Sequence, residues 1–223
     1  MTSRMTKEEL REDRVASAAA QAVEYTRRNA RWVVAAVAVM AVAVGVAVIF
    51  AQGRTKAERE SAVALLRAQS AYMSGNFTDA TTQFDALAGK YGSTRSGRAA
   101  RLYLGNSQLA SGNASAAEQS FRQFLRGPSK DPVQQAAGHR GLGASLLAQD
   151  KAPDAAAEYA QAAKIIGNPM AADDWLMAGI TYGKAGNRTE AAAAFQQILD
   201  NYQKSQTASE ARVRLKEETT AAN

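Results

Sequence analysis

The sequence predicts an all-α protein: a single transmembrane helix, then an α–α superhelix of about four helical hairpins and a C-terminal capping helix. Two observations lead to this fold class. Residues 32–51 form an apolar run with no charged side chain. The turn residues Gly75, Gly112, Asp150 and Gly186 recur 37, 38 and 36 residues apart, each followed by an alanine and an aromatic residue at constant spacing. A period of this length is typical of stacked helical hairpins.

The chain starts with a basic segment, residues 1–31, which we expect to be a cytoplasmic tail that is partly helical. Thr6 and Glu9 have the spacing of a capping box, in which a hydroxyl and a carboxylate satisfy free backbone donors. Three arginines, at 27, 28 and 31, precede the apolar run. Two interpretations remain open: an interfacial helix resting on anionic lipid, or a tail that only secures topology.

The apolar run from Trp32 to Ala51 is predicted to be an uncleaved membrane span. Twenty residues at ~1.5 Å rise cover roughly 30 Å, the thickness of the hydrocarbon core of a bilayer. The tryptophan at its start suits the headgroup level. The region before the run is long for a signal peptide, and the apolar core exceeds the ~7–15 residues expected of one. The candidate cleavage motif Ile49-Phe50-Ala51 has a bulky residue where a small one is needed.

Charge alone does not settle the orientation of this span. Arg27, Arg28 and Arg31 precede it, and Arg54, Lys56 and Arg59 follow it. The charges of a short basic tail count, whereas long domains translocate largely regardless of charge. We therefore expect the N-terminus in the cytoplasm and the repeats on the outer, periplasmic side of a bacterial inner membrane.

The last repeat shows why each unit should be a helical hairpin. Its first half places apolar residues at i, i+3, i+4 and i+7, one face of a helix. Gly186 then ends the helix, because glycine tolerates a positive φ. Gly179 and Ala191 are small, so we expect the two helices to cross there. The larger side chains that should fill the space on either side are Trp175, Tyr182 and Phe195.

The other copies keep the same pattern, and together they resemble the tetratricopeptide repeat. Their signature residues are Gly75, Ala80 and Phe84; Gly105, Gly112, Ala117 and Phe121; and Gly143, Ala155 and Tyr159. The resemblance covers about 61–206, divided at 61–97, 98–135, 136–171 and 172–206. A short helical linker, 52–60, precedes these repeats, and a capping helix and tail, 207–223, follow them.

The order of tail, span and repeats is similar to that of the ancillary subunits of the SecYEG translocon. The repeat domain of the Tol–Pal-linked cell-division coordinator is similar in its hairpins, though it usually follows a cleaved signal. This resemblance implies a location at the membrane and action through protein binding. It does not imply one particular partner.

The inventory of reactive residues argues against an enzyme. There is no cysteine, and His139 is the only histidine, so a catalytic triad or a histidine-based metal site has little to build from. His139 is expected to have a packing role. Asp173 and Asp174 suit a helix N-terminus, where acidic groups are favoured. We predict no cofactor and no metal, and the diffuse net charge of +6 gives no reason to expect nucleic acid.

Stacked hairpins form a concave surface lined mainly by their first helices. The lining expected from the repeat register is Leu65, Gln69, Tyr72, Leu102, Asn106, Leu109, Arg140, Ala144, Leu147, Leu176, Ile180 and Lys184. Only Asn106 and Arg140 could grip a carboxylate, as some tetratricopeptide domains do. An apolar or extended peptide segment fits this lining better. The alternative is that some of these residues belong to the core.

These patterns predict a membrane-anchored protein-interaction module without enzymatic activity. The expected partners are other proteins, either subunits of a membrane complex or exported polypeptides, together with the lipid bilayer around 32–51. One interpretation is a chaperone-like ancillary subunit of a secretion or envelope-assembly system. The alternative is a structural accessory subunit that stabilises one multi-subunit membrane complex through its span and repeats.

Overall fold

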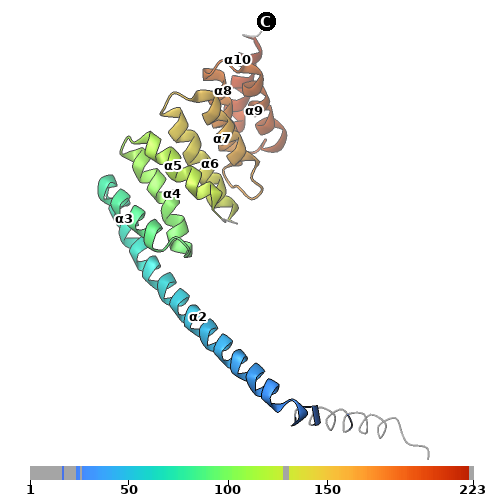
Figure 1. The fold of residues 1–223 in the computed structure, drawn as a ribbon. Coiled ribbons are helices and arrows are strands. Elements are labelled where there is room, and N and C mark those ends of the chain that lie inside the picture. The colour runs from blue at the N-terminus through green and yellow to red at the C-terminus, as the bar shows by residue number, and fades with distance from the viewer. Residues whose placement is uncertain (1–16, 18–23, 26, 128–130, 221–223) are drawn as a thin grey trace, which may run out of the picture. The chain divides into compact units, whose positions relative to one another are not determined.

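The computed structural model describes residues 17, 24, 25, 27–127 and 131–220, and within these residues the regular structure is helical (Figure 1). The predicted all-α class is therefore confirmed. Most of the basic tail, including the Thr6–Glu9 capping box, lies outside the described residues. The helices are α2 (Ala30–Met73), α3 (Phe77–Lys90), α4 (Arg95–Ala110), α5 (Ala114–Arg126), α6 (Pro132–Leu147), α7 (Ala152–Lys164), α8 (Ala171–Lys184), α9 (Arg188–Asn201) and α10 (Thr207–Thr220).

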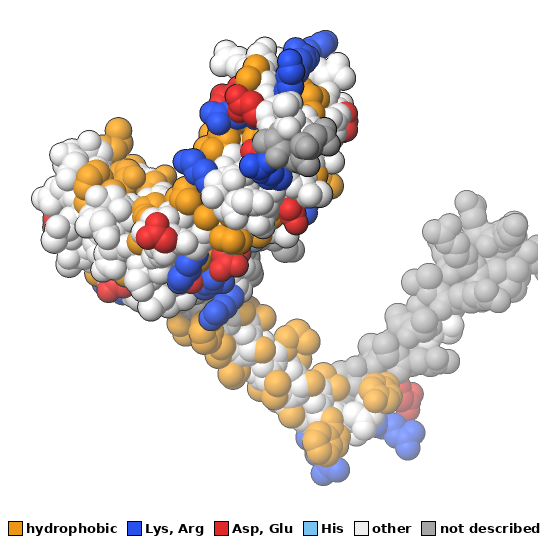
Figure 2. Space-filling model, turned by 90° about the horizontal axis from the view of Figure 1, so that it is seen from above, with side chains coloured by type: hydrophobic (Ala, Val, Ile, Leu, Met, Phe, Trp, Pro, Cys, Tyr) orange, Lys and Arg blue, Asp and Glu red, His pale blue; other side chains and the backbone are white. Residues whose placement is uncertain are grey.

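The chain divides into two compact units, Met1–Thr55 and Lys56–Asn223. In the first unit, the apolar part of α2 has no core of its own. Trp32, Ile49 and Phe50 are 67%, 70% and 76% exposed, and Figure 2 shows apolar side chains around this part of the helix. Among the described residues, α2 is the one helix that is long and apolar enough to cross a membrane.

The second unit is a row of helices in which each packs against its neighbours along the chain, from α3 to α10. The last part of α2 serves as the first helix of the first hairpin and packs with α3 and α4 around Ala68, Ala80 and Phe84. A central cluster joins α4 to α9, and a third joins α8, α9 and α10. The aromatic residues predicted on the second helix of each hairpin all lie in this core; Phe84, Phe121, Tyr159 and Phe195 are 0–4% exposed.

The four turns inside the hairpins share one backbone conformation. Gly75, Gly112 and Gly186 have φ values of 78°, 79° and 81°. Asp150 takes the equivalent place in the third hairpin with φ 59°, the left-handed region that aspartate tolerates better than most side chains. The sequence therefore identified the turn positions correctly, including the one that lacks glycine.

Side-chain caps set where several helices start. Thr94 accepts a hydrogen bond from the backbone N–H of Gly97, so α4 starts at Arg95. Asp131 accepts from the N–H of Val133, so α6 starts at Pro132. Both starts precede the repeat boundaries predicted at 98 and 136, because the caps add a turn that hydrophobic periodicity does not detect.

Candidate interaction surfaces

The first-helix surface consists of the twelve residues predicted to line the concave face of the repeats. Leu102 is buried at 8% exposure, Lys184 is exposed, and the remaining ten are half-buried. Leu65 and Tyr72 pack against the first core cluster, and Leu109 and Leu147 pack against the central one. The two residues from α8, Leu176 and Ile180, pack against the third cluster.

Two polar members of this surface, Gln69 and Asn106, are half-buried and lie outside the core clusters. Ala144 is also half-buried, whereas Lys184 is exposed. The first-helix surface thus combines side chains that support the core with a few polar groups between them. Its binding role stays a prediction.

Arg140 is held by an ion pair rather than presented to a ligand. Its Nε and Nη2 donate to Oδ1 and Oδ2 of Asp174 at 2.6 and 2.8 Å. Asp174 is 1% exposed and also accepts from Nδ2 of Asn168 at 2.8 Å. The hydrogen bond to Asp174 raises the pKa of Arg140. Its guanidinium is therefore engaged within the fold, which argues against a carboxylate grip at this position.

Sequence reasoning missed this pair because it treated the two residues separately. Asp174 does lie in the first turn of α8, where an acidic residue was expected to favour the helix N-terminus. Its charge, however, is satisfied by a side chain from α6. The signal that could have found the pair is its spacing: 34 residues separate Arg140 from Asp174, close to the repeat period.

His139 also makes a contact between helices. Its Nδ1 lies 2.7 Å from Oε2 of Glu158, which joins α6 to α7. Both side chains are mostly covered, at 28% and 22% exposure. The described residues contain no group of three or more His, Asp or Glu side chains that could hold a metal ion. The imidazole therefore has a structural partner, Glu158, within the repeat domain.

Glu118 joins the second hairpin to the third. Its carboxylate accepts from Nε2 of Gln149 at 2.9 Å, from Nζ of Lys151 at 3.1 Å and from Nε of Arg122 at 2.9 Å. The hydrogen bond from Gln149 is the largest cause that lowers the pKa of Glu118 to about 2. Gln149 and Lys151 flank the Asp150 turn, so Glu118 fixes that turn against α5.

Glycines on the first helices allow the aromatic rings to fit closely. A Cβ added at Gly105 or Gly141 would lie 2.8 or 2.3 Å from the ring of Phe121. At Gly179 it would lie 2.5 Å from the ring of Phe195. The sequence paired Gly179 with Ala191, but the nearest atoms belong to Phe195. The signature residues are thus structural, since they set how closely consecutive helices approach.

Comparison with known proteins agrees with this architecture. Residues 24–221 match the family described as tetratricopeptide repeat-like domain. A solved tetratricopeptide repeat protein from Parabacteroides merdae has the same fold, with a TM-score of 0.59 at 18% identity. The match covers 73% of this chain and 61% of the length of that protein. No curated protein matches the sequence. With nearly its whole length matched, this chain belongs to the tetratricopeptide repeat-like domain family.

Proposed function

We propose that this chain is a membrane-anchored module for protein–protein interaction, with its repeats on the outer side of the cytoplasmic membrane. It would hold or assist a partner that is itself membrane-bound or newly exported. The observation that carries the proposal is that a charge-free 20-residue run is followed, after only the short linker 52–60, by a repeat domain. Tetratricopeptide-type folds generally act as non-enzymatic scaffolds for other proteins.

The exposure of the apolar run supports the anchor. Side chains such as Ile49 and Phe50 are largely exposed within the described part of the chain. Leaving apolar area in water costs roughly 25 cal/mol per Å², so such a run needs lipid or another protein around it. The length of the run matches the hydrocarbon thickness of a bilayer. Its orientation follows from the short basic tail that precedes it and the long domain that follows.

The arrangement of charged groups supports a binding role rather than catalysis. Arg140, His139 and Glu118 all bridge helices of the repeat domain. A catalytic group must instead reach a substrate. The polar side chains of the first-helix surface, Gln69 and Asn106, are the candidates for contact with a bound polypeptide.

A fusion reporter tests the membrane topology. We expect a reporter that is active only outside the cytoplasm to be active when it is joined after Asn223. The same reporter joined before Met1 is the matched control and should be silent. Activity of the N-terminal fusion together with silence of the C-terminal fusion would reverse the proposed orientation.

Affinity purification in mild detergent separates the two forms of the proposal. Substoichiometric and heterogeneous client proteins would support a chaperone-like ancillary subunit. A single stoichiometric complex would support the alternative, a structural accessory subunit. Purified repeats that bind no polypeptide and turn over a small substrate would contradict both.

The first-helix surface is tested by the same purification. Gln69→Ala with Asn106→Ala should reduce the amount of co-purified protein. Exposed Gln203→Ala with Asn201→Ala, on the far end of the domain, is the matched control. Equal loss with both pairs would argue against a specific role of the first helices.

A further inference from the structure

The outward face of the first hairpin carries an uncovered apolar stripe. Val63, Leu66 and Met73 are 64%, 67% and 84% exposed, and Ser70 lies between them. Their spacing along α2 places them on one side of the helix. All four residues lie in the unit Lys56–Asn223. The opposite side of α2 carries the buried Ser61 and Ala68.

The repeat register shows that this face is an interface in every later hairpin. The residues equivalent to Val63 are Ala100, Gly138 and Asp174, and those equivalent to Ser70 are Ser107, Ser145 and Thr181. Each of these six residues is buried. The part of the face around Val63 and Ser70 is therefore covered wherever a hairpin precedes it, whereas the residues equivalent to Met73, which are Ala110, Ala148 and Lys184, are exposed.

The covering group in the later hairpins is the second helix of the preceding repeat. Tyr103, the equivalent of Leu66, stacks on Phe84 of α3 with 5.3 Å between ring centroids. Gly141, at the same place in the third hairpin, lies against the ring of Phe121 from α5. The exposed face of α2 thus lies at the repeat position against which one more helix would pack.

At Val63 and Leu66, α2 differs most from the third hairpin, whereas the second hairpin also has a large side chain, Tyr103, at the place of Leu66. The third hairpin has glycine at 138 and 141, which leaves room for the aromatic side chains of the preceding helix. Val63 and Leu66 instead project their own apolar side chains. Exposed apolar side chains rimmed by charge are a feature of protein interaction sites.

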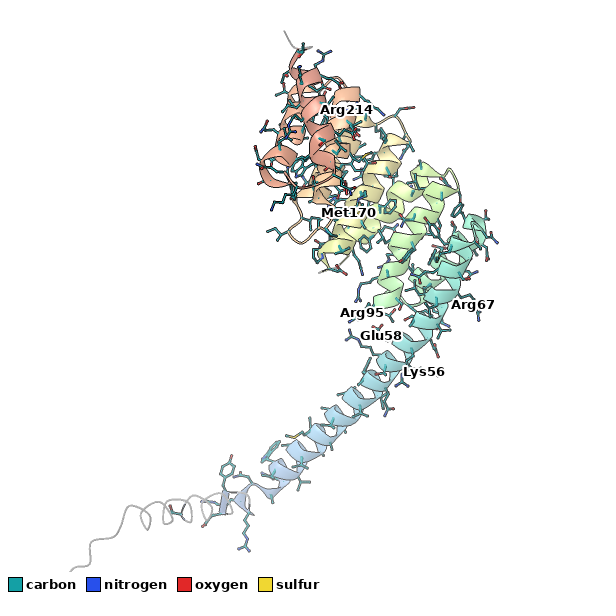
Figure 3. The ribbon with its side chains drawn as sticks, turned by 180° about the vertical axis from the view of Figure 1, so that it is seen from behind. Lys56, Glu58, Arg67, Arg95, Met170 and Arg214 are labelled. Carbon is teal, nitrogen blue, oxygen red and sulfur yellow. The ribbon has the colours of Figure 1, made fainter. Side chains whose placement is uncertain are left out.

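Two exposed arginines lie beside the stripe, whereas the two acidic residues of α2 each accept a hydrogen bond from the chain between the end of α3 and the first residue of α4. Glu58 accepts from the backbone N–H of Arg95 at 3.1 Å, and Glu60 accepts from the hydroxyl of Tyr91 at 2.8 Å. Arg59 and Arg67 are exposed and have no hydrogen bond or ion pair within the described part of the chain. Figure 3 shows Glu58 directed toward Arg95 and Arg67 directed away from the other helices.

We propose that this face of α2 is the docking site for an amphipathic helix of a different protein, whose carboxylates flank an apolar stripe. The helix takes the place that the second helix of a preceding repeat would occupy. A second copy of this chain fits poorly. It would bring the same exposed arginines to the contact, and the acidic residues of its own α2, Glu58 and Glu60, already accept hydrogen bonds within that copy. The site is separate from the first-helix surface and stands whether or not that surface binds a partner.

Cross-linking with solubilised native membranes tests this proposal, because the chain has no cysteine and the purified chain with a single introduced one is labelled at one position. The Leu66→Cys chain is labelled with a photoactivatable maleimide after purification and then mixed with the solubilised membranes, and Val213→Cys, 59% exposed on α10, is the matched control. We expect one adduct of defined added mass at position 66 and none at 213. Arg59→Glu with Arg67→Glu in the Leu66→Cys chain should reduce the adduct by about tenfold.

A synthetic probe tests the chemistry of the partner directly. The full chain in detergent should bind a helical peptide with leucines on one face and flanking glutamates about tenfold more tightly than its lysine-flanked counterpart. The double arginine-to-glutamate variant should reverse this preference. Its unfolding midpoint should be unchanged, because both arginines are exposed.

Four outcomes would overturn the proposal. The first is an adduct at twice the chain mass of 23.6 kDa, which would identify a second copy. The second is an adduct of equal yield at 66 and 213, or none at 66. The third is an adduct whose yield is independent of the arginines. The fourth is equal affinity for the two peptides.

Discussion

The two ends of the repeat domain differ in whether another helix covers their outer face. At the C-terminal end, α10 covers the last hairpin, with Ala208 and Ala211 buried against Phe195 and Ile198. At the N-terminal end, the outward face of α2 leaves Val63 and Leu66 exposed. A repeat array needs a cap at each end to remain soluble. Among the described residues, one end therefore has a capping helix, and the proposed external helix would supply the corresponding cap at the other end.

The largest expected effect is loss of the built-in cap. Deletion of 207–223 uncovers Phe195 and Ile198, and each large apolar side chain removed from water contributes about 1.5–3 kcal/mol. We expect the free energy of unfolding, measured by urea titration, to fall by several kcal/mol. Deletion of 1–55 is the control and should leave the midpoint of the repeat domain unchanged. If both deletions lowered the free energy of unfolding equally, α10 would not have the special capping role described here.

The ion pair between half-buried Arg140 and buried Asp174, which joins two hairpins, should matter almost as much. Arg140→Met leaves the carboxylate of Asp174 buried with only Asn168 as a side-chain partner. Removal of one member of a buried pair typically costs about 3–5 kcal/mol, and the remaining hydrogen bond places this case near the lower value. Arg67→Met on the bare face of α2 should be neutral. Urea unfolding of both variants checks the contrast.

Exchange of equivalent residues sharpens the comparison between covered and bare faces. Gly141→Leu introduces at an inner junction the residue that α2 has at position 66. The ring of Phe121 lies where the new Cβ would be, so we expect a cost of about 1–3 kcal/mol from overpacking. Leu66→Ala should change stability by less than about 0.5 kcal/mol. A neutral result at 141 would mean that the junction is looser than the structure indicates.

The smallest expected effect is on the pH dependence of stability. Because the pKa of Glu118 is lowered to about 2 from 4.5, its contribution is present above pH 4.5 and is lost as pH falls toward 2. Glu118→Gln should therefore lose less of its stability than the wild type between pH 5 and pH 2.5. Exposed Glu217→Gln is the control and should follow the wild type.

The sequence predicted the turns and the aromatic core well, because both depend on local chemistry. Gly75, Gly112 and Gly186 adopt the positive φ that their residue type allows, and Asp150 takes the same conformation at the predicted place. The buried aromatic residues recur at fixed distances from these turns. The periodicity of the sequence is therefore enough to predict this part of the fold.

Contacts between repeats could not be predicted from periodicity. Arg140 was assigned to a binding surface and instead pairs with Asp174, and Gly179 faces Phe195 more closely than any other residue. Such contacts depend on how two hairpins are rotated against each other. Exposure of the stripe on α2 likewise needs the three-dimensional register, since Val63 and Leu66 look like ordinary core residues in the sequence.

Chemical protection of one cysteine tests the central contrast most directly. Leu66→Cys and Val213→Cys chains are treated with N-ethylmaleimide in native membranes and again after purification in detergent. We expect position 66 to react slowly in membranes and rapidly when purified, with position 213 reactive in both. Rapid reaction at position 66 in native membranes would contradict an externally supplied cap.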